Sequence, residues 1–423
     1  MNHQHTYKPR RLGAVLVALA AVSMLSSTTT AVAKKAVAKP KPKATTTTKA
    51  PTPTAAPATT SAPTTVAPTT TAAAATLVEG CAKGWTDPVS ISGTRQIARC
   101  DKGFPAPKPL KEKTKIKVSS AFRLEFNSPF LLADSLGEFA KENIEIEFVS
   151  LSLANSIPQL AEGRLDVGTG GFEVALFNAG AQNLPVRAVL GNYFPPKASN
   201  YKVPQTGLWC RRDSFAKPSE PDFRNTEQMK WATSVGKGSV GIYYAAAELV
   251  RRFPDFKIKN VEIVVVPSGD AVTALRNKAI DCSILLDPFW LQVANDPQFV
   301  MVSTQTPGEP LGVYVYGKRM LENPEIGDAF ARAFIRTVNT YYSGDYHEDP
   351  AVLAAIGKAT NLQTASLKAV DSLSMDWELR AGTTSRVQQL FIDLGVITTY
   401  STPVSEDKIV DRSFYERAVG KRK

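Results

Sequence analysis

Histidine is scarce in this chain of 423 residues. It occurs three times, and His3 and His5 lie at the N-terminus, which leaves His347 alone in the rest of the chain. Catalytic Ser–His–Asp or Cys–His groups and histidine-rich zinc sites all need imidazole side chains. His347 stands in the polar stretch GDYHEDP, and we expect it to be a solvated surface residue. The scarcity of histidine excludes histidine-based catalysis. A Ser–Lys or two-carboxylate enzyme is still an alternative, although no spacing of such residues indicates one.

Acidic residues are absent from residues 1–76, which carry nine Lys or Arg. Residues 77–423 therefore hold 41 Lys and Arg against 39 Asp and Glu, and the formal net charge of +11 belongs mainly to the N-terminal segment. The rest of the chain is close to neutral and shows no stripe of alternating basic and aromatic residues. This pattern argues against nucleic acid as a partner.

Long apolar runs are missing too, with one exception near the N-terminus. Leu12–Leu25 follows Lys8, Arg10 and Arg11 and precedes the small residues of Ala31–Ala33. This order is typical of a secretory signal peptide, so we expect residues 1–33 to be removed near Ala33 and the mature protein to be secreted, periplasmic or associated with the cell wall. The run of about 14 residues is shorter than the roughly 20 that span a bilayer. An uncleaved anchor is the alternative, and the arginine pair leaves twin-arginine export open.

Between the signal peptide and the main fold the composition predicts two further segments. Residues 34–76 are almost entirely Ala, Thr, Pro and Lys, with too little apolar surface to offset the entropy of ordering, so we expect a disordered linker. Residues 77–112 follow as a short extension that contains the first two of only four cysteines, Cys81 and Cys100. An even number of cysteines in an exported chain favours disulfides over a metal site.

Cys81 and Cys100 bracket a short segment, so we expect them to form a disulfide that staples the extension. Cys210 and Cys282 are then left to pair with each other by elimination. For this second pair the alternative is two buried thiols in neighbouring strands.

A strand–loop–helix pattern occurs twice in the chain. Leu160–Gly180 (LAEGRLDVGTGGFEVALFNAG) and Leu275–Asn295 (LRNKAIDCSILLDPFWLQVAN) share the spacing from Leu to Asp and an apolar strand that ends in an acidic loop. Strands that alternate with helices predict βαβ units and mainly parallel sheets. We therefore expect an α/β fold of two lobes, with residues 113–204 and 311–423 in lobe I and 205–310 in lobe II. After Pro324 the pattern is helical, and no strand is predicted there.

The segment Gly236-Lys237-Gly238-Ser239-Val240-Gly241 matches the dinucleotide fingerprint GxGxxG between a strand and a helix. The next strand ends in Val266-Pro267-Ser268 without the acidic residue that binds a ribose. Export also removes the chain from the cytoplasmic nucleotide pool. We therefore expect these glycines to let the backbone approach a ligand other than a nucleotide, beside N–H groups at the start of a helix.

Small polar and aromatic residues recur in six loops at the carboxyl ends of the predicted strands, where ligands of open α/β sheets bind. For any single loop, ordinary helix capping or turn chemistry is the alternative. The predicted ligand-binding residues are Phe126, Asn127, Ser152, Asn155, Gly170, Gly171, Glu173, Asn192, Tyr193, Gly238, Ser239, Ser268, Asp287 and Trp290. From the two repeated loops we expect backbone donors at Gly170 and Gly171 and an aromatic wall at Trp290.

Several of these stretches resemble a known family, the periplasmic solute-binding proteins of ABC importers, in the group that binds nitrate, sulfonates, taurine or thiamine precursors. The resemblance covers about residues 113–423. It is carried by SPFLLADSLGEFAKENIEIEFV, IPQLAEGRLDVGTGGFEVALFNAG, WATSVGKGSVGIYYAAAELV, VVVPSGDAVTALRNKAIDCSILLDPFW and, near the C-terminus, LFIDLGVIT with DKIVDRSFYERAV.

The resemblance implies a two-lobe (type II) fold with a C-terminal helical segment, which closes on one small molecule and delivers it to an ABC permease. It implies a monomer that needs no cofactor or metal and performs no catalysis. Glu173 and Asp287 depart from the family pattern, and without compensation by Arg123 or Lys237 two acids would repel an anion, which favours a cationic or amine-bearing ligand. The alternatives are a wall-tethered sensor or adhesion module on the same fold, and a thiamine-pyrimidine biosynthetic enzyme.

Overall fold

The computed structural model describes residues 78–81, 100–195, 206–223 and 228–420. The predicted signal peptide and linker lie outside these residues. No helix in the described part of the chain is long and apolar enough to cross a membrane.

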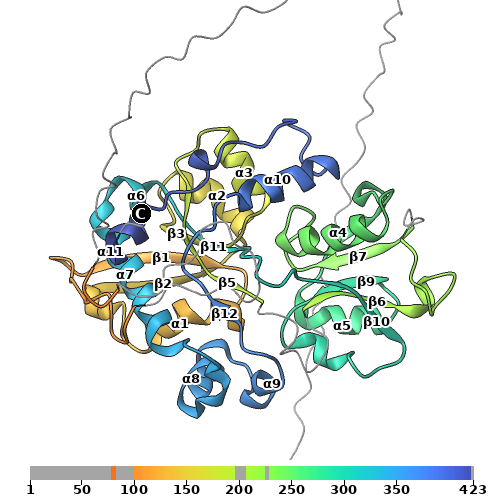
Figure 1. Cartoon of the computed structure of the whole chain (residues 1–423), viewed down its shortest axis with the longest axis horizontal. Coiled ribbons are helices and arrows are strands. Elements are labelled where there is room, and N and C mark those ends of the chain that lie inside the picture. Colours follow the sequence, from red (N-terminus) through yellow and green to blue (C-terminus); the bar gives the residue numbers. More distant parts are fainter. Residues whose placement is uncertain (1–77, 82–99, 196–205, 224–227, 421–423) are drawn as a thin grey trace, which may run out of the picture. The chain divides into compact units, whose positions relative to one another are not determined.

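The described chain forms two α/β lobes, each built on a five-stranded sheet (Figure 1). In the first sheet the order is β2 (Ile144–Ser150), β1 (Thr114–Ser120), β3 (Val167–Gly171), β11 (Gly312–Tyr316) and β4 (Arg187–Gly191). In the second it is β8 (Glu262–Val265), β7 (Lys230–Thr233), β9 (Cys282–Leu285), β6 (Gly207–Arg211) and β10 (Phe299–Thr304).

The two sheets share one topology. In each, the fourth strand in this order, β11 or β6, runs antiparallel to both of its neighbours, and the remaining strands run in one direction. The reversed strand is in both cases the first strand after the chain crosses between the lobes. The mainly parallel sheets expected from the alternation of strands and helices are thus confirmed.

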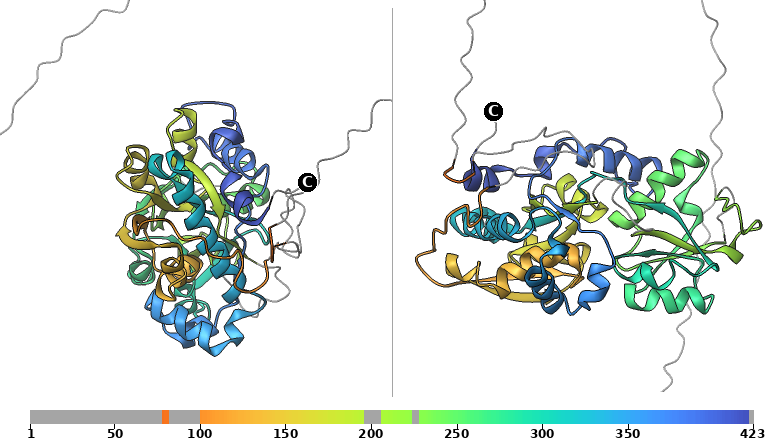
Figure 2. Two further views of the ribbon diagram at one scale, coloured as in Figure 1. Left: turned by 90° about the vertical axis from the view of Figure 1, so that its left-hand side faces the viewer. Right: turned by 60° about the horizontal axis from the view of Figure 1, so that its bottom comes forward.

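Helices cover both sheets. The first lobe carries α1 (Ser128–Ser135), α2 (Leu153–Ala161), α3 (Val174–Ala181) and the C-terminal series α6 (Lys318–Glu322), α7 (Pro324–Tyr341), α8 (Pro350–Thr360), α9 (Thr364–Lys368), α10 (Thr383–Asp393) and α11 (Ser413–Val419). The second carries α4 (Val240–Arg252) and α5 (Ser268–Arg276). Helix α10, in the blue part of Figure 2, contacts both α3 and α4, so the C-terminal segment touches both lobes.

Three strands appear where none was expected: the edge strand β10 of the second sheet and the short strands β5 and β12. β12 (Ser374–Met375) lies after Pro324 and pairs antiparallel with β5 (Tyr193–Phe194), at the start of the segment that crosses to the second lobe. The prediction of a strand-free C-terminal region was therefore wrong. Two residues are too few to show the period-2 alternation by which a strand is predicted.

The internal repeat is a structural repeat. Asp166 and Asp281 precede β3 and β9, and one carboxylate oxygen of each accepts a backbone N–H at 2.8 Å, from β1 and β7 respectively. The other oxygen pairs with an arginine, Arg319 at 2.9 Å or Arg211 at 2.8 Å. At the end of the sheet away from the loops of the candidate site, Asp281 thereby joins β9 to β7 and β6, and Asp166 joins β3 to β1 and to helix α6. This common role explains the equal spacing of the two copies.

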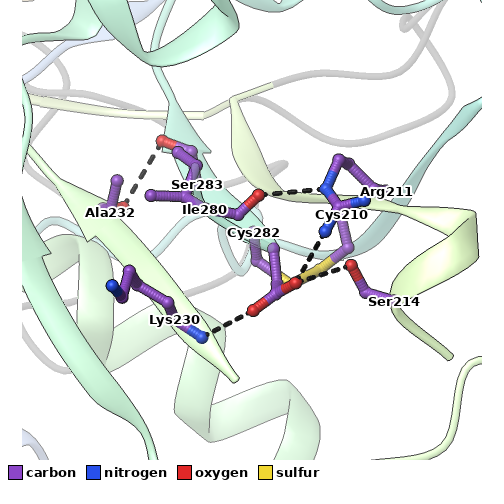
Figure 3. The surroundings of a disulfide bond; sticks show 9 residues. Cys210, Arg211, Ser214, Lys230, Ala232, Ile280, Cys282 and Ser283 are labelled. Atoms are coloured by element: carbon purple, nitrogen blue, oxygen red, sulfur yellow. Dashed lines mark hydrogen bonds and ion pairs between the residues drawn. A yellow bond between two sulfur atoms is a disulfide. The ribbon is translucent and has the colours of Figure 1, made fainter. Parts of the chain in front are cut away.

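Both disulfides form as predicted. Cys210 and Cys282 are partners across the antiparallel strands β6 and β9 (Figure 3), and Cys81 pairs with Cys100. The extension is also held by α7, because the Arg336 guanidinium donates to the carbonyl of Pro105 at 2.9 Å and to Glu142 at 2.9 Å. The described part of the extension is therefore fixed to the first lobe.

Replacing Cys210 and Cys282 together with Ala is expected to lower the free energy of unfolding by up to about 4 kcal/mol, because the bond closes a loop across a sequence separation of 72 residues. Urea denaturation of the variant and the parent protein measures this loss. The matched change at Cys81 and Cys100, separated by 19 residues, is expected to cost less, about 3 kcal/mol, because a shorter loop loses less chain entropy on closure. Equal stability of the Cys210/Cys282 variant and the parent would contradict the prediction.

Candidate functional site

A pocket with about 730 Å³ of empty space, including its opening to solvent, lies between the two lobes at the strand ends. Side chains from both sheets and from the starts of α2 and α4 line it. Seven of the predicted ligand-binding residues are in its wall: Phe126, Asn127, Gly170, Gly171, Glu173, Tyr193 and Ser239. The carboxyl ends of the strands therefore converge on one site, as the loop pattern predicts.

The other seven predicted residues lie outside the wall: Ser152, Asn155, Asn192, Gly238, Ser268, Asp287 and Trp290. Some of them support it. The Asn192 amide donates to Asn127 Oδ1 at 3.4 Å, and the Ser268 hydroxyl is 2.7 Å from that of Ser234, which lines the pocket. Ser152 caps α2 by accepting the N–H of Asn155 at 3.4 Å. This last pair therefore shows ordinary helix capping, which was the alternative interpretation of any single loop.

Trp290 does not form the aromatic wall that we expected. Its side chain is 1% exposed, stacks on Trp209 with ring centroids 6.4 Å apart, and belongs to the core of the second lobe. The indole N–H donates to Asp287. The loop after β9 thus turns its tryptophan inward, where it finds apolar neighbours and a partner for its one polar atom.

The aromatic residues of the pocket come from other segments. Phe122 and Phe126 follow β1, with ring centroids 5.7 Å apart, and the Phe126 ring lies 5.5 Å from that of Tyr193. Tyr244, from the first turns of α4, also lines the pocket, and Gln305 donates to its hydroxyl at 2.9 Å. Phe122 and Tyr244 were not predicted. The aromatic pair in AFRLEFN was the available signal for Phe122, whereas Tyr244 lies inside a helix that reads as core.

Three polar atoms of the pocket wall are buried without a hydrogen-bond partner among the described residues. They are Thr169 Oγ1, Glu173 Oε1 and Ser239 Oγ. A buried polar atom without a partner costs roughly 1–3 kcal/mol, so such atoms are rare in folded proteins unless water or a ligand completes them. Their concentration in one pocket marks the place where a ligand would supply the missing partners.

Glu173 supplies the carboxyl group of the pocket wall. Its side chain is 6% exposed, and burial raises its pKa to about 8, although a hydrogen bond from the backbone N–H of Ala154 opposes the shift. Ala154 belongs to the first turn of α2, so the carboxylate occupies the N-terminus of that helix. No lining side chain among the described residues is Lys, Arg or His. The Arg123 guanidinium instead lies 4.1 Å from the centroid of the Phe148 ring.

The two lobes are in contact beside the pocket. The N–H of Val174, at the start of α3, donates to the carbonyl of Gly238 in the opposite lobe at 3.1 Å. A Cβ atom on Gly238 would lie 2.9 Å from the Cβ of Val174, and one on Gly171 would lie 2.1 Å from Val240 Cγ2. The chain is therefore in a closed arrangement in which glycines let the two backbones approach.

His347 is buried, contrary to the prediction of a solvated residue. It is 4% exposed, and its Nε2 lies 2.6 Å from Glu125 Oε1, which also accepts the hydroxyl of Tyr346 at 2.6 Å. Burial by itself would lower the pKa of His347, but the hydrogen bond and charge of Glu125 outweigh it and raise that pKa. In the other lobe burial raises the pKa of Asp287 to about 6, and the charge of Glu125 adds to the shift. The charge of a group in one lobe thus influences the pKa of a group in the other.

Several solved structures share this architecture. A ligand-binding component of an ABC-type import system from Staphylococcus aureus, solved with zinc bound, aligns with a TM-score of 0.54 at 13% identity, over 72% of this chain and 99% of that chain. The periplasmic nitrate-binding protein NrtA from Synechocystis PCC 6803 aligns with a TM-score of 0.54 at 13% identity, over 74% and 89%. The alkanesulfonate-binding protein SsuA from Xanthomonas axonopodis pv. citri, bound to MOPS, gives 0.51 at 14%, over 71% and 99%.

The chain has the periplasmic-binding-protein fold. The predicted fold class, two α/β lobes with helix-flanked, mainly parallel sheets, is confirmed. No family model and no curated protein sequence matches the chain. At 13 to 14% identity the likeness to the solved structures extends to the fold, and the ligand has to be inferred from the pocket of this chain.

Proposed function

We propose that this protein is an extracytoplasmic solute-binding protein that captures one small molecule between its lobes and delivers it to an ABC importer in the membrane. The observation that carries the proposal is the interlobe pocket, whose wall holds three buried polar atoms without partners among the described residues. Closure of two lobes around a ligand is the usual way in which such folds bind. The predicted signal peptide would place the protein outside the cytoplasm, as a monomer that binds without turnover.

Native mass spectrometry of the mature protein, purified from its secreted or periplasmic fraction, tests the proposal. A stoichiometric small molecule is expected on the intact protein, and its removal by partial unfolding and refolding is expected to increase the radius of gyration in small-angle scattering as the lobes separate. Adding the molecule back is expected to reverse the change and raise the melting temperature. A protein that carries no solute, and does not compact with any solute of its growth medium, would contradict the function.

A further inference from the structure

We propose that the pocket is selective for a compact ligand that combines an apolar body with a protonated nitrogen, and that Glu173 is the residue that holds this nitrogen. The inference deepens the proposed function and rests on it. It assigns to this chain a ligand of opposite charge to the nitrate and sulfonate named for the similar structures.

The charge of the pocket wall is the first feature that favours a cation. An anion that loses its water in a closed pocket needs a positive partner, because a buried unpaired charge is very costly. The described wall offers no basic side chain, and Arg123 is stacked on Phe148 instead. Glu173 adds a carboxyl group at the same place. Electrostatics at this site therefore disfavour an anion and favour a cation.

The helix ends at the pocket support the same conclusion. The positive end of a helix can hold an anion, but at α2 this position is occupied by the carboxyl group of Glu173, through its hydrogen bond from Ala154. At α3 the first N–H, of Val174, donates to Gly238 across the boundary. The start of α4 remains, where the unpartnered hydroxyl of Ser239 can bind a polar group of the ligand. Of the starts of α2, α3 and α4, two are thus already satisfied by the chain itself.

Glu173 Oε1 is the atom that would accept the ligand N–H. This atom is buried in the wall without a partner among the described residues, so a ligand N–H placed against it completes its hydrogen bonding. A cation there also restores the ionised carboxylate, because an opposite charge within about 4–6 Å lowers the pKa of an acid that burial has raised. The rings of Phe126 and Tyr193 border the same pocket and can contact both the apolar body and the cation.

Benzamidine, benzamide and benzoate form a matched set of probes, since they share one ring and nearly one shape but carry a positive, zero and negative charge. With the full-length, solute-free protein at pH 7.5, benzamidine is expected to raise the melting temperature and to bind at least tenfold more tightly than benzamide in calorimetry. Benzoate is expected not to bind. The affinity for benzamidine is expected to rise with pH up to about 8 and then level off, because the cation requires ionised Glu173.

Glu173→Gln is expected to reduce the affinity for benzamidine at least tenfold and to leave benzamide within about threefold. Glu248→Gln, the same change at a half-exposed residue of α4 outside the pocket wall, is the control and should alter neither. Binding of benzoate or benzamide as tight as that of benzamidine, no binding of benzamidine, or equal binding by the parent and Glu173→Gln would each overturn the proposal. A co-purified anionic solute would refute the ligand class and leave solute binding intact, whereas the absence of any bound solute would refute the function.

Discussion

Glu173→Gln is expected to stabilise the ligand-free protein at alkaline pH and to leave its stability almost unchanged in acid. The carboxyl group titrates at a pKa of about 8 in the folded chain, against the ordinary value of 4.5 for a glutamate. Because the pKa of Glu173 is raised in the folded chain, the folded protein keeps its full stability below pH 4.5, where the carboxyl group is protonated in both states. Part of this stability is lost as the pH rises through about 8. Each pKa unit corresponds to about 1.4 kcal/mol, which sets a ceiling of about 5 kcal/mol on the gain.

Urea denaturation of the solute-free parent protein and Glu173→Gln, at several values between pH 4 and 9, measures this gain. The difference in the free energy of unfolding is expected to grow from near zero at pH 4 to a few kcal/mol at pH 8.5. Glu248→Gln, on the outer side of α4 where Glu248 pairs with Arg251 at 2.7 Å, is the control and is expected to change the free energy of unfolding by no more than about 1 kcal/mol throughout this range. A difference that stays constant, or that shrinks as the pH rises, would show that Glu173 ionises as readily in the folded chain as in the unfolded one.

This expected gain has a functional meaning. A buried carboxyl group that destabilises the empty protein can be explained by a role in binding, since proteins give up stability at functional sites. A cation beside Glu173 would remove the penalty that the empty pocket imposes. The free energy lost by the empty protein would then contribute to closure when the ligand enters.

The parts of the fold that could be predicted from the sequence depend on local pattern. The equal spacing of Leu160–Asp166 and Leu275–Asp281 is visible because each Asp binds the backbone of a neighbouring strand, and one such contact per lobe fixes the repeat. Strand ends were also predictable from local pattern, because apolar runs stop where polar loops begin. Half of the predicted residues reached the pocket wall because parallel strands bring their carboxyl ends to one edge.

The side chains that could not be predicted are those whose partners are distant in the sequence. His347 looks polar in GDYHEDP, yet it is buried because Glu125, 222 residues away, accepts its hydrogen bond. Trp290 looks suited to a ligand wall, but Trp209 offers it a better packed position. Tyr244 faces the pocket from a helix whose sequence is typical of core. Local pattern gives the placement of loops, whereas the direction of a side chain is decided by segments that the pattern does not connect.

The glycines of GxGxxG show how a correct observation can carry the wrong role. Gly238 was predicted to let the backbone approach a ligand. The structure shows that the close approach is to the other lobe, since its carbonyl accepts the N–H of Val174 and no room remains for a Cβ atom. The need for glycine was readable in the sequence. The identity of the neighbour was not, because it belongs to α3, more than sixty residues earlier.

Gly238→Ala is therefore expected to impair closure without unfolding either lobe. The three nearest atoms to its new Cβ, at 2.9 to 3.8 Å, all belong to Val174 of the opposite lobe, so separation of the lobes relieves the clash. Overpacking of this kind costs roughly 1–3 kcal/mol, which corresponds to a loss of about 5- to 150-fold in ligand affinity when only the closed state binds. Small-angle scattering with saturating co-purified solute should show a radius of gyration that stays large.

Two matched variants decide whether the effect comes from the lobe boundary. Val174→Gly removes every atom that crowds the new methyl group, so the double variant Gly238→Ala/Val174→Gly is expected to regain compaction and most of the affinity. Gly269→Ala makes the same change in the same lobe, with its nearest contact 4.0 Å away at Phe289, and should bind and close like the parent. If Gly238→Ala closes normally, or if Val174→Gly fails to rescue it, the contact between these two residues does not limit closure and the lobes must meet elsewhere when the ligand binds.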